Sequence, residues 1–132
     1  MAEEIICLDT SILIGFFRSK QKESAALTQL SSLYSGFAVL VITLYEIYAG
    51  STENQRSFWD DLFAWMTILP FDIQANEAAV QIYKDLKSSN KLIEIPDIFI
   101  AATALSNRLR LATANRKHFE RIHHLALVDI PG

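Results

Sequence analysis

The 132-residue sequence predicts an α/β fold in which helices cover both faces of a central parallel sheet, giving three layers. Three observations support this prediction. Short apolar runs alternate with helical patterns along the chain, which is typical of βα units. No linker-like segment or internal repeat divides the sequence. Hydrophobic residues make up 51% of the chain and charged residues 20%, which is enough for one buried core. We therefore expect residues 1–132 to form a single domain.

The first third of the chain contains two predicted strands. Residues 4–9 are apolar and β-branched and end in an acid, so a buried strand is expected, followed by a helix from near Ser11 to Ser19. Apolar side chains at helical spacing predict an amphipathic helix over residues 23–34, which Gly36 should end. Residues 37–42 are apolar at every position, the pattern of a strand covered on both faces.

The middle of the chain is expected to be mainly helical. Thr43 and Glu46 have capping-box spacing, which predicts a short helix that Gly50 ends. The next helix carries two apolar stripes: Phe58, Leu62, Trp65 and Met66 form one, and Trp59 and Phe63 begin the other. A helix with two apolar faces usually buries one on its own sheet and the other against something else. We expect the stripe of Trp59 and Phe63 to contact another protein.

The last half adds three predicted strands and three helices. Residues 68–71 form a short strand, and Asp72 caps a long helix that runs to Leu86. Pro96 and Asp97 open a helix that is apolar on nearly all sides and therefore lies in the core. Three further elements are expected: a strand over 109–113, a short helix over 116–122 and a strand over 125–128.

Composition and motifs exclude several classes of protein. The four glycines lie far apart, so phosphate-binding glycine loops are absent. Cys7 lies in an apolar run, where a small buried side chain in a reducing compartment is expected. His118, His123 and His124 have no cysteine partners that would indicate zinc. The acidic N-terminus and the absence of an apolar run of about 20 residues predict a cytoplasmic protein with no membrane partner.

Four polar residues are expected at one edge of the sheet. Asp9 ends the first strand, Glu46 lies one turn beyond the second, Asp97 starts the apolar helix and Asn115 follows the strand that ends at Thr113. Ligands of an open parallel sheet bind at the carboxyl ends of its strands. Three carboxylates gathered there repel each other unless a cation neutralises them, and oxygen ligands suit Mg²⁺ or Mn²⁺. Hydroxyl groups of Thr10, Ser11, Thr43 and Thr113 could orient a carboxylate or a water.

Each of these residues also has a purely structural interpretation. Asp9 could cap the helix that follows it, and Glu46 could be the second half of a capping box. Asp97 lies where a helix dipole favours an acid, and Asn115 is a common loop residue. The joint placement of the four residues is what favours a functional site.

Four sequence blocks resemble those of a PIN domain, in particular the short VapC-type toxins of type II toxin–antitoxin systems. The blocks are residues 8–14, 43–50, 95–104 and 111–115 with Phe119. The resemblance implies a Mg²⁺- or Mn²⁺-dependent endoribonuclease whose catalytic residues are Asp9, Glu46, Asp97 and Asn115, with the first three as metal ligands. Family members often have an acid three residues after the position of Asn115, where this chain has His118.

The resemblance also implies partners. These are an RNA substrate, a cognate antitoxin and a second copy in a homodimer, and the stripe of Trp59 and Phe63 is the candidate contact for the antitoxin or the second copy. The net charge of −3 argues against a general nucleic-acid binder, but it becomes 0 without the three site acids. Five basic residues near Asn115 could contact phosphates: Arg108, Arg110, Arg116, Lys117 and Arg121.

Two alternatives remain at this point. One is a PIN-like module that binds RNA or protein with weak or no nuclease activity, which Asn115 and His118 favour because they replace acids. The other is a small regulatory domain with an acidic pocket, such as a receiver. A receiver needs paired acids after the first strand and a lysine after the last, and neither is present.

Overall fold

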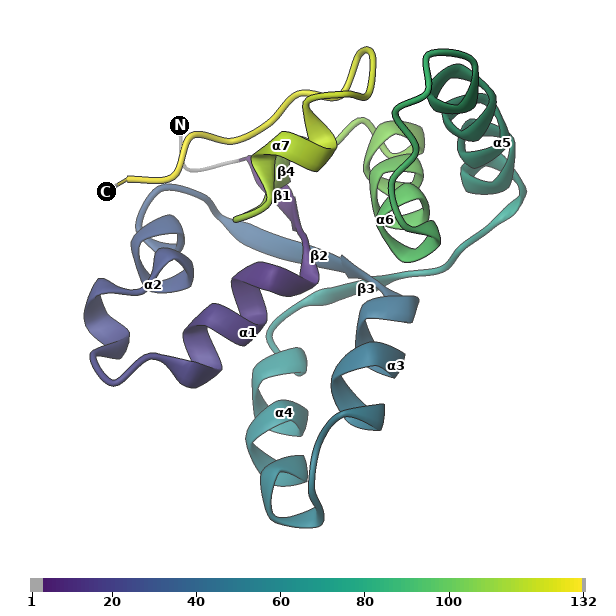
Figure 1. Ribbon diagram of the computed structural model, residues 1–132. Coiled ribbons are helices and arrows are strands. Elements are labelled where there is room, and N and C mark those ends of the chain that lie inside the picture. The colour runs from purple at the N-terminus through teal and green to yellow at the C-terminus, as the bar shows by residue number, and fades with distance from the viewer. Residues whose placement is uncertain (1–3, 132) are drawn as a thin grey trace.

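The computed structural model describes residues 4–131, which contain a four-stranded sheet with the strand order β3-β2-β1-β4. β1 (Ile5–Leu8) lies between β2 (Gly36–Leu40) and β4 (Leu111–Ala112), and β3 (Thr67–Leu69) pairs with the far side of β2. All three strand pairs are parallel. The predicted α/β fold with a parallel sheet is confirmed (Figure 1).

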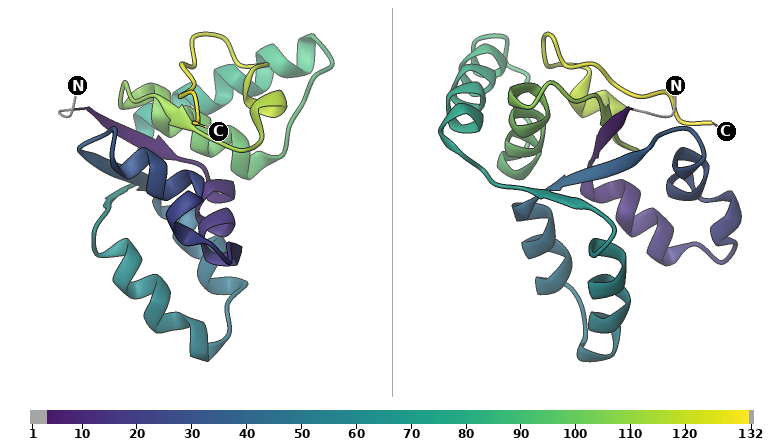
Figure 2. Two further views of the ribbon diagram at one scale, coloured as in Figure 1. Left: turned by 90° about the vertical axis from the view of Figure 1, so that its left-hand side faces the viewer. Right: turned by 180° about the vertical axis from the view of Figure 1, so that it is seen from behind.

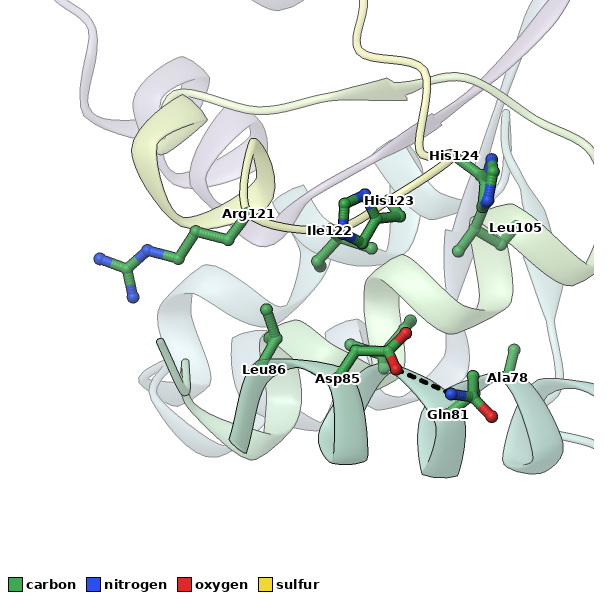
Figure 3. Close-up of a pocket in the computed structure, with 10 residues that line it drawn as sticks. Ala78, Gln81, Asp85, Leu86, Leu105, Arg121, Ile122, His123 and His124 are labelled. Atoms are coloured by element: carbon green, nitrogen blue, oxygen red, sulfur yellow. Dashed lines mark hydrogen bonds between the residues drawn. The ribbon is translucent and has the colours of Figure 1, made fainter. Parts of the chain in front are cut away.

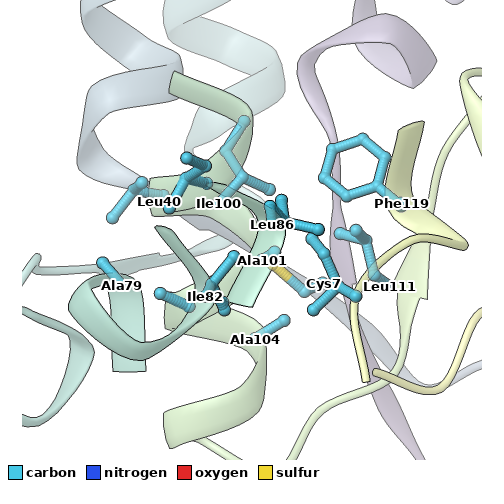
Figure 4. Packing of buried hydrophobic residues seen from close by; sticks show 13 residues of the cluster. Cys7, Leu40, Ala79, Ile82, Leu86, Ile100, Ala101, Ala104, Leu111 and Phe119 are labelled. Atoms are coloured by element: carbon cyan, nitrogen blue, oxygen red, sulfur yellow. The ribbon is translucent and has the colours of Figure 1, made fainter. Parts of the chain in front are cut away.

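Two long helices and one short one cover the first face of the sheet. α5 (Ile73–Ser88) and α6 (Ile95–Ser106) lie side by side, and α7 (Arg116–Phe119) follows β4 (Figures 1 and 2). Asp72 caps α5 as predicted, because its Oδ1 accepts a hydrogen bond of 2.9 Å from the Ala75 amide. Figure 4 shows the apolar cluster beneath these helices. Its members include Cys7, Leu40, Ala79, Ile82, Leu86, Ile98, Ile100, Ala101, Ala104, Leu111 and Phe119.

Four helices cover the second face of the sheet. They are α1 (Thr10–Arg18), α2 (Ala26–Ser31), α3 (Val41–Ala49) and α4 (Arg56–Phe63), with 3₁₀ turns at Lys22–Ser24 and Glu53–Gln55. Side chains alternate between the two faces along a strand. Thus Ile6 and Leu8 join the cluster on this face, whereas Cys7 between them joins the other. The strands β1, β2 and β4, which are covered on both faces, carry no charged, amide or hydroxyl side chains. The polar residues that follow them lie at the carboxyl ends of these strands.

Several element boundaries differ from the sequence prediction: β3 is Thr67–Leu69 where 68–71 was expected, β4 is Leu111–Ala112 where 109–113 was expected, and α7 ends at Phe119 where 122 was expected. Three further differences are larger. The helix expected over 23–34 is a 3₁₀ turn followed by the shorter α2, and Gly36 begins β2 where a helix stop was expected. The strand expected over 37–42 ends at Leu40, which has extended backbone angles and is followed directly by α3. The strand expected over 125–128 is a single parallel bridge between Leu127 and Leu111.

The assignment of the two stripes of α4 was wrong. Trp59 and Phe63 are 3% and 6% exposed and pack into the core, where the Trp59 ring lies 5.1 Å from Phe17 and 5.9 Å from Phe63. Trp65 is 87% exposed because α4 ends at Phe63, which places Trp65 in the turn before β3. The expected contact surface of Trp59 and Phe63 is therefore not available to a partner.

None of the helices within residues 4–131 combines the length and the apolar character that crossing a bilayer requires.

Candidate active site

The predicted site residues lie where strands end and helices begin. Asp9 follows β1 and directly precedes α1, while Glu46 lies in α3, the helix that continues from β2. Asp97 is in the first turn of α6, and Thr113 and Asn115 follow β4. The connections from β1 into α1 and from β2 into α3 can be followed in Figure 1.

Asp9 is the most buried acid of the site, with 2% of its surface exposed. Its Oδ2 accepts hydrogen bonds from the Ser11 hydroxyl (2.6 Å) and the Thr113 hydroxyl (2.7 Å). Its backbone amide donates to the Ala112 carbonyl at 2.9 Å. Asp9 occupies the N-cap position of α1, but its side chain makes no capping hydrogen bond. The interpretation of Asp9 as a helix cap is therefore wrong, because its carboxylate is turned to the hydroxyls.

The two hydroxyls are themselves oriented by the loop after β4. The Ala114 amide donates to Ser11 Oγ at 3.0 Å, and the Asn115 amide donates to Thr113 Oγ1 at 2.9 Å. A hydroxyl has one proton to donate and can accept elsewhere. Because each oxygen already accepts from an amide, both protons are directed to Asp9, which holds the carboxylate in one orientation.

Glu46 belongs to a second set of hydrogen bonds, which centres on Thr10. The Thr10 hydroxyl donates to Glu46 Oε1 at 2.9 Å and lies 3.2 Å from Thr43 Oγ1. The predicted capping box of Thr43 and Glu46 is wrong, since α3 begins at Val41 and Leu40 is its N-cap. Thr43 is fully buried inside the helix. Thr10 follows Asp9 directly in sequence, so Glu46 is tied to the segment that carries Asp9.

Asp97 faces the charge of Asp9. Desolvation raises the pKa of the Asp97 carboxyl, the negative charge of Asp9 raises it further, and His118 opposes the shift. His118 Nδ1 lies 3.5 Å from Asp97 Oδ2. An acid whose pKa is raised by a second acid is one whose negative charge is not fully compensated. The negative charge of Asp9 is thus felt at Asp97, and the two carboxylates repel each other.

Asn115 is exposed and precedes α7. It occupies the N-cap position of this short helix without a side-chain capping bond, and its backbone amide orients Thr113. Its side-chain amide is accessible at the edge of the network. The sequence interpretation does not foresee the contact between Asp97 and His118. The only signal for it is the three-residue spacing from Asn115 to His118, which places the histidine one helical turn further along.

The basic residues near Asn115 do not form one surface. Arg110 makes two hydrogen bonds to the Glu4 carboxylate and one to the Tyr34 hydroxyl, and it lies at the amino end of β4, away from the carboxyl edge. Arg121 binds backbone carbonyls of the loop between α5 and α6. Arg116 donates to the Val128 carbonyl at 3.0 Å. These three guanidinium groups have structural partners, so the expected phosphate-binding cluster is dispersed.

His123 and His124 lie away from the acids. Their ring centres are 6.3 Å apart, and both line a cavity of about 240 Å³ between α5, the end of α6 and the loop after α7 (Figure 3). Its floor is apolar, and Asp85, Gln81 and Arg121 contribute polar groups. Within residues 4–131, no set of three His, Cys, Asp or Glu side chains is close enough to hold a metal ion.

The donor atoms of the predicted site are of the kind that a hard divalent cation prefers. The predicted ligands Asp9, Glu46 and Asp97 do not come close enough together to form a set that could hold a metal ion, although the charge of Asp9 raises the pKa of Asp97 and Glu46 contacts Thr10, the residue after Asp9. Carboxylate oxygens are the ligands that suit Mg²⁺ and Mn²⁺.

Comparison with known proteins identifies the family. A model of the PIN domain matches residues 6–125. The chain belongs to the PIN domain family. Ribonuclease VapC1 of Methanocaldococcus jannaschii is 31% identical over 126 residues, which cover 95% of this chain and 86% of the relative. Ribonuclease VapC1 of Rickettsia felis is 32% identical over 133 residues, which cover 95% and 96%.

Solved complexes share the fold of this PIN domain. DNA-bound VapBC from Salmonella typhimurium matches with a TM-score of 0.81 and 26% identity, covering 96% of this chain and 98% of that chain. VapBC-1 from nontypeable Haemophilus influenzae matches with a TM-score of 0.80 and 27% identity, covering 95% and 97%. The PIN domain resemblance seen in the four sequence blocks is thereby confirmed.

Proposed function

We propose that this PIN domain is a Mg²⁺- or Mn²⁺-dependent endoribonuclease and the toxin of a toxin–antitoxin pair. The observation that carries the proposal is the pairing of two acids from distant parts of the chain. Asp9 is buried and fixed by two hydroxyls, and its charge acts on Asp97. Two carboxylates that repel each other are unfavourable for folding, and a bound cation would offset this repulsion.

The relatives support the proposal. The curated proteins that match over most of this chain carry the name Ribonuclease VapC, and they come from an archaeon and from bacteria. The solved structures that share the fold include VapBC and a toxin–antitoxin complex from Klebsiella pneumoniae. We infer that a cognate antitoxin binds this chain and that RNA is its substrate, which would place its activity in the cytoplasm.

Each residue of the site has a separate role in the proposed reaction. Asp9 and Asp97 would hold the cation, and Glu46 would bind it through a water or position the attacking water. Asn115, which is exposed beside Thr113, would orient a water or the scissile phosphate. A bound divalent cation supplies a more acidic water and polarises the phosphate. Ser11 and Thr113 keep Asp9 Oδ2 engaged and leave Oδ1 without a hydrogen bond from the described residues.

Cleavage of RNA by the purified chain tests the proposal. We expect the chain to cut RNA in Mg²⁺ or Mn²⁺ and to lose this activity in EDTA. Cation binding without cleavage in any RNA, structured or single-stranded, would favour the alternative of a PIN-like binding module, which Asn115 and His118 motivate. Absence of both cation binding and cleavage would contradict the proposed activity.

Co-expression tests the toxin role. Expression of this chain alone should stop growth, and co-expression of a short neighbouring open reading frame should restore it. The two proteins should then purify together at a fixed ratio. The homodimer stays a prediction, and its surface must be sought outside Trp59 and Phe63, which are buried. Unchanged growth on expression of the active chain would contradict a toxin role.

A further inference from the structure

The cavity between α5 and the loop after α7 lies apart from the acidic site. Leu105, near the end of α6, lines this cavity, whereas Asp97 is in the first turn of the same helix. At 1.5 Å per residue the two positions are about 12 Å apart along the helix axis. A small ligand in the cavity would therefore not touch the acids of the proposed nuclease.

The inner surface of the cavity is apolar and fixed by the core. Ile82, Leu86 and Ile122 are each no more than 6% exposed and belong to the core cluster beneath the helices. The apolar lining residues are Ala78, Ile82, Leu86, Leu105 and Ile122. Pockets for drug-sized ligands measure about 300–1,000 Å³. A cavity of about 240 Å³ is smaller, which suits one planar ring system.

Polar groups face each other across this apolar surface (Figure 3). On the α5 side, Gln81 Nε2 donates to Asp85 Oδ1 at 2.8 Å, which orients the carboxylate. Asp85 Oδ2 accepts no hydrogen bond from residues 4–131 and lies on the side of the cavity that faces His123. Because a carboxylate only accepts hydrogen bonds, this side favours a ligand with N–H groups.

The loop opposite α5 supplies two imidazole rings. His124 has a φ of 68°, in the left-handed region. Side chains of consecutive residues point to opposite sides of an extended chain. The left-handed turn instead lets His123 and His124 line the same cavity. Histidine rings are among the side chains on which unstacked nucleic-acid bases stack.

Arg121 adds a positive charge at one end of the cavity (Figure 3). Its Nη1 donates to the carbonyls of Lys91 and Leu92 at 3.3 and 3.2 Å, which fixes the guanidinium. These bonds use one of its nitrogens, and the remaining N–H groups are of the kind that binds phosphate oxygens.

We propose that this cavity binds a guanine nucleotide, with the base against the apolar surface and the imidazoles, its Watson–Crick edge on Asp85 and its phosphate toward Arg121. Guanine offers two adjacent donors, N1–H and the N2 amino group, which match one carboxylate. Adenine, cytosine and uracil place an acceptor beside their donor and so match Asp85 less well. The inference is independent of the proposed nuclease, and both a free nucleotide and an unpaired guanine of RNA have this chemistry.

Nuclear magnetic resonance of the three imidazoles in the full chain locates the ligand. In EDTA, guanosine monophosphate should shift the resonances of His123 and His124 and leave that of His118, beside Asp97, unchanged. Ala78→Phe fills the cavity and should abolish the shifts. Val80→Phe, at an exposed position of α5 outside the cavity, is the matched control and should retain them. Circular dichroism verifies that each variant is folded.

Calorimetry tests the selectivity for guanine. Guanosine monophosphate should bind about tenfold or more tightly than adenosine monophosphate, the scale of one good bidentate base contact. Asp85→Asn should remove most of this preference, because an amide presents one donor and one acceptor. Glu77→Gln, an exposed position of the same helix outside the cavity, should keep it.

A single-stranded RNA with one guanine distinguishes the sources of the base. Shifts with the free nucleotide alone would support a nucleotide site, and shifts with the RNA as well would support a site that also takes bases of RNA. Equal binding of adenosine monophosphate, or shifts that persist in Ala78→Phe, would overturn the proposal. Absence of any shift would also overturn it and would leave an apolar side chain of a partner protein as the occupant. These measurements need no RNA cleavage, so their failure would leave the nuclease proposal standing.

Discussion

Ser11 and Thr113 lie 102 positions apart in the chain and donate hydrogen bonds to the same oxygen of Asp9. Both hydroxyls accept hydrogen bonds from consecutive amides of the loop after β4, which fixes the direction of each. The first and last parts of the fold are thereby joined at the carboxylate on which the proposed chemistry depends.

Removing one of these hydroxyls should weaken the site. In Thr113→Val, Asp9 loses one donor and the Asn115 amide loses its acceptor. We expect RNA cleavage and cation affinity to fall by about 10- to 100-fold and stability to fall by about 1–3 kcal/mol. Thr113→Ser keeps the hydroxyl and should retain most of the RNA cleavage, the cation affinity and the stability of the wild type. Thr67→Val, at an exposed strand position, is the control. Full activity in Thr113→Val would show that the hydroxyl does not position Asp9.

Neutralising an acid of the pair should separate activity from stability. Asp9→Asn and Asp97→Asn each remove one of two charges that repel each other. We expect RNA cleavage to fall to background while the Tm of the metal-free protein stays unchanged or rises by a few degrees, about the effect of 1 kcal/mol or less. Asp61→Asn changes an exposed acid and should alter neither. Unfolding of both site variants would instead indicate a structural role.

Glu46 should matter to activity and not to the helix. Because α3 begins at Val41, Glu46 does not cap it, and its contact is with the Thr10 hydroxyl. Glu46→Gln keeps an oxygen acceptor for Thr10 and removes the charge. We expect cleavage to fall by at least about tenfold, on the scale of losing a positioned catalytic group, with helical content unchanged by circular dichroism. Glu77→Gln, on the exposed side of α5, serves for comparison. Equal cleavage by the two variants would exclude Glu46 from the site.

Two tryptophans should respond oppositely to truncation. Trp59 is buried among aromatic rings, so Trp59→Ala should cost about 3–5 kcal/mol in urea-induced unfolding. Trp65 is 87% exposed, and Trp65→Ala should stay within about 0.5 kcal/mol of the wild type. Similar losses in the two variants would contradict the burial described for α4.

The thiol of Cys7 should be protected by the fold. Cys7 lies in β1 and its thiol is buried against α5 and α6, which raises the pKa of this thiol from 9.0 to about 12. Because the folded state retains a proton that the unfolded state releases, stability should decrease as pH rises from about 9 toward 12. Ellman's reagent should label Cys7 only when urea unfolds the chain, and the Cys7→Ala variant should lose this part of the pH dependence. Rapid labelling of the native protein would contradict the burial.

The parallel sheet could be predicted because the signs of each strand lie within a few consecutive residues of the sequence. The apolar runs before Asp9 and before α3 are short and flanked by helical patterns, and topology then brings their carboxyl ends to one edge. Local patterns could not locate the end of β2, since Val41 and Ile42 continue the apolar run although they begin a helix. A buried helical turn and a buried strand have the same composition.

Side-chain partners depend on tertiary contacts that periodicity does not encode. The spacing of residues on α4 reveals two stripes, but it does not say which of them faces the sheet. Likewise, Asp97 and His118 come from different helices. Their contact depends on how α7 packs against the core that it shares with α5 and α6. The sequence could thus place Asp9 after β1 and Asp97 at the start of α6, but it could not show the contact between Asp97 and His118.

The segment 126–128 supports the strand that precedes Thr113. β4 has only two residues, and Leu111 exchanges backbone hydrogen bonds with Ala126 and Val128 on the side opposite β1. Arg116 ties the start of α7 to the same segment through the Val128 carbonyl. We expect a fusion that displaces residues 126–128 to loosen the loop that carries Thr113. Such a change would reduce the proposed RNA cleavage although it does not touch Asp9, Glu46 or Asp97.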